Sequence, residues 1–167
     1  MEDDSVCDEK KTGEKKLPML AITGVSGAAH LFYQFNIDRE TENPDAYRVF
    51  GLLVLSDLRS RYRKEGNEKY GMDDFYHVTK TENCSGFCIN IVWGGASGKD
   101  DALRIISESF DYVLGFDPDE HTYGDKDTEN LVRNNLAAAQ KLTVSVRREI
   151  FEEDSVTYEH EYWDPFD

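Results

Sequence analysis

The clearest structural signal in the sequence is a long helix over residues 43–66, because capping residues and an apolar stripe agree there. Asn43 can cap the amino end, Pro44 suits the first helical position, and Gly66 suits the carboxyl end. A helix with one apolar face needs an apolar surface to pack against, so the rest of the chain must supply one. The stripe repeats at three- and four-residue spacing and consists of Tyr47, Val49, Phe50, Leu53, Val54, Leu58 and Tyr62.

Four short segments rich in aromatic and branched residues can form that surface as a β-sheet. The predicted strands are residues 17–22, 29–37, 75–78 and 87–93. A turn is expected between the first two strands, because small residues gather there at Gly24, Ser26 and Gly27.

Two more helices are predicted after the strands. Asp100 can cap the second helix, and an acidic loop over residues 115–127 leads to a third helix that starts at Asp127 or Thr128 and runs at least to Gln140. This order of elements predicts an α+β fold, a mainly antiparallel sheet with two or three helices packed on one face. The apolar face of the second helix is Leu103, Ile106, Phe110, Val113 and Leu114.

The chain after residue 140 permits two interpretations. One is a terminal hairpin that turns near residues 153–155, and the other is a third helix that continues through Arg148. Branched residues favour the strands of the hairpin. The alternating residues are Leu142, Val144 and Val146 on one side, and Val156, Tyr158, His160 and Tyr162 on the other.

The net charge of -15 is concentrated in three segments. Residues 1–16 carry -2, residues 117–130 carry -5, and residues 149–167 carry -8, while the remainder is neutral. We therefore predict a flexible tail over residues 1–16, an α+β domain over residues 17–148, and an acidic and aromatic segment over residues 149–167. Excess carboxylate disfavours nucleic acid, whose backbone requires clustered Lys and Arg, and favours a protein partner with a basic surface.

Composition limits the class of protein further. The length of 167 residues fits one domain, and an aromatic content of 12% is too high for a disordered chain. No apolar run approaches the ~18 residues of a membrane helix, so no membrane contact is expected. Cys7, Cys84 and Cys88 are an odd number without a secretory signal, which predicts reduced thiols in a cytoplasmic, intracellular protein.

Three segments resemble catalytic or binding motifs and fail at diagnostic positions. The loop at residues 94–99 is one residue too short for a phosphate-binding loop, and Asp100 stands where a hydroxyl is needed. The second glycine of residues 24–28 comes one place too early for a nucleophilic serine. The acidic loop has Thr122 and Thr128 where a calcium-binding EF-hand needs Gly and Glu. We predict no catalytic residue, no cofactor and no metal site.

The last residues of the chain combine carboxylates with large aromatic side chains, which suits docking against a basic, partly apolar surface. The alternative is a C-terminal strand whose alternate aromatic residues are buried in the core. The candidate partner-binding residues are Tyr158, Glu159, Glu161, Tyr162, Trp163, Asp164 and Phe166.

Residues 17 to about 140 resemble a single domain of the pitrilysin/insulinase metallopeptidase superfamily. The resemblance rests on the order and spacing of GAAHLFYQFNI, PDAYRVFGLLVLSDLRSRYRKEGNEKYG, SGFCINIVW, KDDALRIISESFDYVL and DTENLVRNNLAAAQ. The inverted zinc motif H-x-x-E-H of the family enzymes is absent from this sequence. The resemblance therefore implies a non-catalytic domain that packs against or binds a partner.

The leading prediction is a non-enzymatic, acidic interaction domain that engages a basic protein. One alternative is a hydrolase or nucleotide-handling enzyme with a site near Gly94 to Asp101. Another is a mimic of nucleic acid that inhibits a DNA-binding protein, which requires carboxylates in a stripe at the spacing of phosphates.

Overall fold

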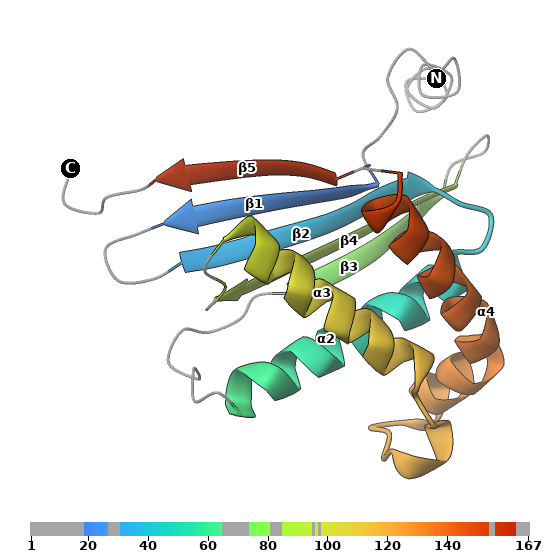
Figure 1. Ribbon diagram of the computed structural model, residues 1–167. Helices are drawn as coiled ribbons and strands as arrows, with labels where there is room; N and C mark the ends of the chain where they lie inside the picture. The colour runs from blue at the N-terminus through green and yellow to red at the C-terminus, as the bar shows by residue number, and fades with distance from the viewer. Residues whose placement is uncertain are drawn as a thin grey trace.

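The computed structural model describes residues 19–26, 31–64, 74–80, 85–94, 96, 98–153 and 156–162. Their strands form one five-stranded sheet in the order β3-β4-β2-β1-β5 (Figure 1). In chain order the elements are β1 (Leu20–Ser26), β2 (Leu31–Glu40), α2 (Pro44–Lys64), β3 (Asp74–Lys80), β4 (Ser85–Gly94), α3 (Lys99–Leu114), the 3-10 helix η2 (Pro118–Glu120), α4 (Lys126–Phe151) and β5 (Val156–Tyr162).

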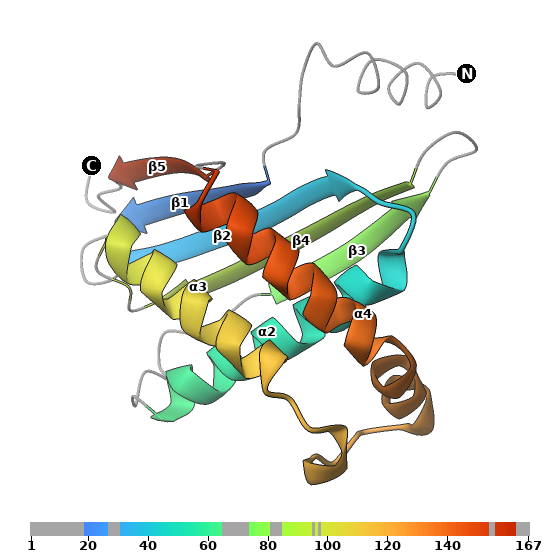
Figure 2. The same ribbon diagram turned by 45° about the vertical axis from the view of Figure 1, so that its right-hand side comes forward.

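The sheet is mixed but mostly antiparallel. Strand β2 pairs antiparallel with β1 and β4, and β3 pairs antiparallel with β4, whereas β5 runs parallel to β1. Helices α2, α3 and α4 all lie on the same face of the sheet (Figure 2). The predicted α+β class and the one-sided helix layer are confirmed.

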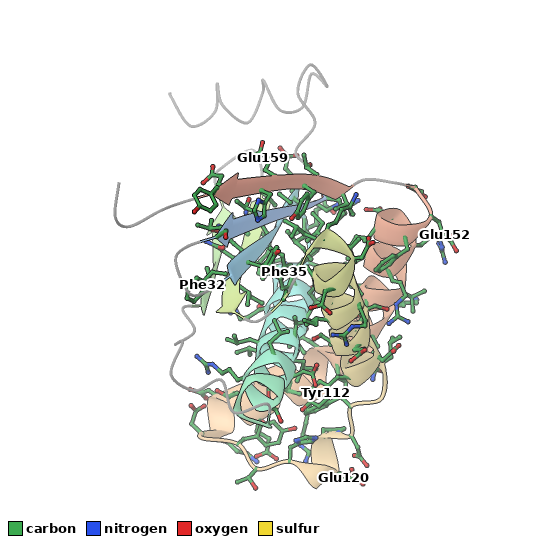
Figure 3. All side chains as sticks on the ribbon, turned by 60° about the vertical axis from the view of Figure 1, so that its left-hand side comes forward. Phe32, Phe35, Tyr112, Glu120, Glu152 and Glu159 are labelled. Atoms are coloured by element: carbon green, nitrogen blue, oxygen red, sulfur yellow. The ribbon has the colours of Figure 1, made fainter. Side chains whose placement is uncertain are left out.

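Alternation along β2 separates a buried face of the sheet from an open one. Tyr33, Phe35 and Ile37 point to the helices and are at most 1% exposed, whereas their neighbours Phe32 and Gln34 are only partly buried. Figure 3 shows Phe35 between the sheet and the helices, with Phe32 on the other side of the strands. The core therefore lies between one sheet face and the three helices.

Aromatic contacts join α2 to both neighbouring layers. The ring centroids of Phe50 and Phe110 on α3 are 5.5 Å apart, and those of Tyr47 and Phe87 on β4 are 4.9 Å apart. The Ser109 hydroxyl on α3 donates a hydrogen bond to the Asp57 carboxylate on α2 at 2.9 Å. These two buried polar groups therefore satisfy each other. The predicted apolar stripe of α2 from Tyr47 to Leu58 is thus the centre of the core, and the side chain of Tyr62 lies outside the described part of the chain.

Several predicted boundaries are wrong. Gly24 and Ser26 belong to β1 instead of a turn, because Gly24 pairs with Tyr33 on β2. Helix α3 begins at Lys99 after Gly98, so Asp100 lies in its first turn and is not the cap. At the start of α2 the prediction is confirmed, since Asn43 Oδ1 accepts from the Ala46 backbone N–H at 3.3 Å.

The first strand of the favoured terminal hairpin is also wrong, because α4 runs from Lys126 to Phe151. This is the alternative of a third helix that continues through Arg148, whereas the second strand of the hairpin is found as β5. A helical stripe outweighs the strand preference of the branched residues, since Val132, Ala139, Thr143, Val146 and Ile150 are all buried. The Thr143 hydroxyl donates to the Ala139 carbonyl at 2.7 Å, so a buried Thr is accommodated inside the helix. Helix α4 thus crosses residue 148, where the sequence predicts a division between domain and acidic segment.

Gly24 tests the close packing of three neighbouring strands. A Cβ there would lie 2.6 Å from Cε1 of Tyr33 and 3.0 Å from Cδ2 of His160. We expect Gly24→Ala to lower the free energy of unfolding by about 1–3 kcal/mol, measured by urea denaturation, because the Tyr33 ring must shift. Gly124→Ala is the control, since no atom lies within 4 Å of a Cβ built there. Equal stability of the two variants would contradict the packing described.

Candidate functional site

Strand β5 places the predicted partner-binding residues at an edge of the sheet. It pairs with β1 and ends the strand order, so within the described residues its other side has no neighbouring strand. Tyr158 and Tyr162 alternate with Glu159 and Glu161, which puts the tyrosines and the glutamates on opposite faces. Trp163, Asp164 and Phe166 lie outside the described residues.

Tyr158 is turned toward the core. It packs against the buried cluster and forms a hydrogen bond with Tyr33, whose side chain is only 1% exposed. Burial, and next the hydrogen bond with Tyr158, raise the pKa of Tyr33 to about 12. Tyr158 therefore anchors β5 to the sheet, whereas Tyr162 is 75% exposed.

Glu159 and Glu161 point to the face of the sheet that carries no described helix. Both are exposed, and no described Lys or Arg forms an ion pair with either. Their strand neighbours on β1 are Thr23 and Val25. Two uncompensated carboxylates thus stand beside uncharged side chains on an open surface.

The acidic loop differs, because four of its six carboxylates, Asp117, Asp119, Asp125 and Glu129, have partners within the loop or on α4. Asp117 accepts from the Asp119 backbone N–H at 2.9 Å, Asp125 accepts from the Thr128 backbone N–H at 2.7 Å, and Arg133 bridges Asp119 and Glu129. The loop also lies at the opposite end of the molecule from β5, as Glu120 and Glu159 show in Figure 3. The two acidic segments therefore do not form one surface or one stripe.

The region from Gly94 to Asp101 joins β4 to α3. Gly98 has an extended backbone and its carbonyl accepts the first helical hydrogen bond from Ala102 at 2.9 Å. Lys99 and Asp100 are exposed, and Asp101 pairs with Arg104 at 2.6 Å. Gly95 and Ser97 of the predicted alternative site lie outside the described residues.

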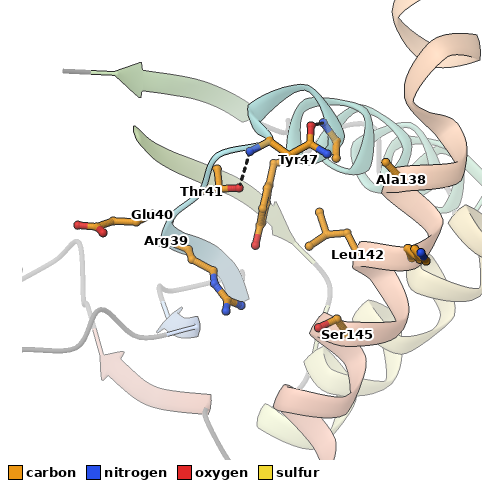
Figure 4. A pocket seen from close by; sticks show the side chains of 10 residues that line it. Arg39, Glu40, Thr41, Tyr47, Ala138, Leu142 and Ser145 are labelled. Carbon is orange, nitrogen blue, oxygen red and sulfur yellow. Dashed lines mark hydrogen bonds between the residues drawn. The ribbon is translucent and has the colours of Figure 1, made fainter. Parts of the chain in front are cut away.

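A pocket of about 480 Å³ lies where β2, α2 and α4 meet (Figure 4). One of its two cationic side chains, Arg39, is paired, because its Nη1 atom contacts both oxygens of Glu149 at 3.2 and 3.0 Å, and the other is Lys141. Burial raises the pKa of Tyr47, while Arg39 opposes the shift. The pocket thus combines a neutralised ion pair with further charged, polar and apolar side chains. Its lining is Arg39, Glu40, Thr41, Asn43, Ala46, Tyr47, Ala138, Lys141, Leu142 and Ser145.

The described residues contain no group of three His, Cys, Asp or Glu side chains placed to hold a metal ion. None of the helices found in them has the length and apolar content to cross a membrane. Comparison with protein-family models and with curated proteins finds no match to this chain. The resemblance to a pitrilysin/insulinase domain stays a prediction.

The structure adds acidic residues that the sequence interpretation missed. Asp38 and Glu40 alternate with Ile37 and Arg39 on β2, so they lie on the same open face as Glu159. The signal was present in the sequence, because polar residues occupy every second position from Gln34 to Glu40. The parallel pairing of β5 with β1 could not be inferred from that alternation.

The burial of Tyr33 and its hydrogen bond with Tyr158 predict a loss of stability in alkali. Tyr33 has a higher pKa when folded, about 12 against 10.0, so its contribution is complete below pH 10 and is lost as the pH rises toward 12. We expect up to about 2–3 kcal/mol of the free energy of unfolding to disappear over this range, measured by urea denaturation. Tyr33→Phe should lack this slope and Tyr158→Phe should reduce it, whereas the exposed control Tyr162→Phe should keep it.

The cap at Asp125 predicts an acid-sensitive start of α4. The backbone N–H of Thr128 lowers the pKa of Asp125, so the stabilisation is present above about pH 4 and is lost as the pH falls through the lowered pKa. Asp125→Asn keeps a capping oxygen and should melt near the wild-type temperature at pH 7 without this pH dependence. Asp125→Ala should melt lower at pH 7, and an unchanged melting temperature would contradict the cap.

Proposed function

We propose that this protein is a non-enzymatic interaction domain that binds a basic protein partner through β5. The observation that carries the proposal is the pair Glu159 and Glu161, two exposed carboxylates on one face of an edge strand without a described cation beside them. An edge strand also offers backbone groups to an incoming extended segment, which is a common mode of peptide recognition.

Charge complementarity would act mainly on the rate of association and on selectivity. The acidic loop is a poorer candidate for this role, because Asp119 and Glu129 are already paired with Arg133. Tyr162 is the exposed aromatic residue of β5 that a partner can cover, whereas Tyr158 is engaged with Tyr33. The resemblance to a pitrilysin/insulinase domain, which implies a non-catalytic role, agrees with this proposal, but the proposal does not depend on it.

The proposal is tested with a fluorescent lysine-rich peptide and anisotropy measurements. We expect Glu159→Gln/Glu161→Gln to weaken binding about three- to tenfold, which corresponds to roughly 0.7–1.4 kcal/mol, and added salt to weaken it further. Removing the chain after residue 153 is a poorer test, since it deletes Tyr158 together with the glutamates.

The matched control is Glu152→Gln/Glu153→Gln, which removes the same charge from two exposed residues at the end of α4. Equal losses in the two double variants would show that net charge alone attracts the peptide, and would contradict a site on β5.

A further inference from the structure

The face of the sheet opposite the helices carries an arrangement of charge of which the function proposed above uses only the two glutamates of β5. Among the described strands β1, β2, β4 and β5, the sole Lys or Arg is Arg39, whose side chain bonds Glu149 on the helix side. The open face of these strands carries carboxylates and no cation. The carboxylates are Asp38, Glu40, Glu159 and Glu161.

The strand register places Glu161 and Glu40 farthest apart along the open face, with Glu159 and Asp38 between them. Glu161 lies beside Val25, which pairs with Phe32, while Glu40 is eight residues farther along β2 from Phe32. At about 3.4 Å a residue, that separation is about 27 Å along the strand. An α-helix of about 18 residues has the same length.

Uncharged side chains fill the middle of this surface, where Glu159 is level with Gln34 and Asp38 follows four residues later, about 14 Å along β2. Across β1, β2 and β4, Thr23 is aligned with Gln34 and Val92, and Ala21 is aligned with Asn36 and Asn90. The six side chains are partly buried, and no described helix lies over them (Figures 1 and 2). Val25 and Val92 make the surface partly apolar near Glu161.

Two acceptors on this face also have no described donor. The Oε1 atom of Glu40 and the Oδ1 atom of Asn90 are buried and make no hydrogen bond within the described residues, although both side chains are partly exposed. Since unsatisfied acceptors are costly when water is excluded, donors from a partner would stabilise both after small side-chain rotations. Lys and Arg are rich in donors and have no acceptor, so they fit both the charge and this deficit.

We propose that the open face binds an amphipathic helix of a partner protein, about 18 residues long, with basic residues near both ends and small apolar residues between them. The inference rests on the proposed function and names the shape and chemistry of the partner. A second copy of this chain fits worse, because it would set the same four carboxylates against one another. Residues 1–16 fit worse too, since their net charge is -2.

The probe is a synthetic helical peptide of about 18 residues with lysines at both ends and alanine and leucine along one face. Binding is followed by anisotropy and by amide shifts in ¹⁵N-labelled full-length protein. We expect the amide shifts at Thr23, Gln34, Asn36 and Val92. We also expect Gln34→Lys to lower the affinity for the peptide tenfold or more, because it puts a cation at the centre of the face. The matched control Asn134→Lys adds the same charge to an exposed position on α4, and its affinity for the peptide should fall far less.

The outcomes separate this inference from the function on which it rests. Shifts confined to β5, with binding lost in Glu159→Gln/Glu161→Gln but kept in Gln34→Lys, would overturn the open-face site and leave the β5 proposal standing. Equal binding of wild type and all charge variants would overturn both. A dimer in sedimentation that Gln34→Lys abolishes would assign the face to a second copy instead. A scrambled peptide of the same charge that binds equally well would also overturn the helical occupant.

Discussion

The alternation of side chains along the strands determines which groups of this protein are buried and which face outward. Phe35 on β2 packs under the helices while Gln34 and Asn36 face away, and the pairing with β1 and β4 carries the same division across the sheet. A shift of the register by one residue would exchange the two faces of a strand. The open acidic face therefore depends on the same contacts that form the core.

Strand β5 acquires its orientation from this division. Its Tyr158 stands opposite Ile22 on β1, so the tyrosine meets the core, and the alternation turns Glu159 and Glu161 outward. The close approach of Gly24 to Tyr33 and His160 holds the three strands together with little tolerance. Exposure of Glu159 and Glu161 is thus a consequence of packing on the other side of the strand.

Local patterns in the sequence were sufficient for the fold class but not for the carboxyl end. The cap at Asn43 and the stripe through Phe50 are local signals, and they predicted α2 correctly. Val144 and Val146 favour strands when taken alone, yet Val146 is buried in a helix because its partners stand three and four residues away. The pairing of β5 with β1 joins segments far apart in the chain, and no local pattern encodes such a contact. The orientation of Glu159 therefore could not be predicted from the sequence and is known only from the structure.

The acidic residues that give the net charge of -15 do not all have the same structural role. Carboxylates such as Asp119 and Asp125 are satisfied by an arginine or by a helix start, and their charge stabilises the loop that contains them. Glu159 and Glu161 have no such partner among the described residues, so neutralising them would cost the fold little. A charge that contributes little to folding yet is held in place by a packed strand is available for binding. For that reason the sheet, and not the most acidic loop, is where recognition of a basic partner is expected.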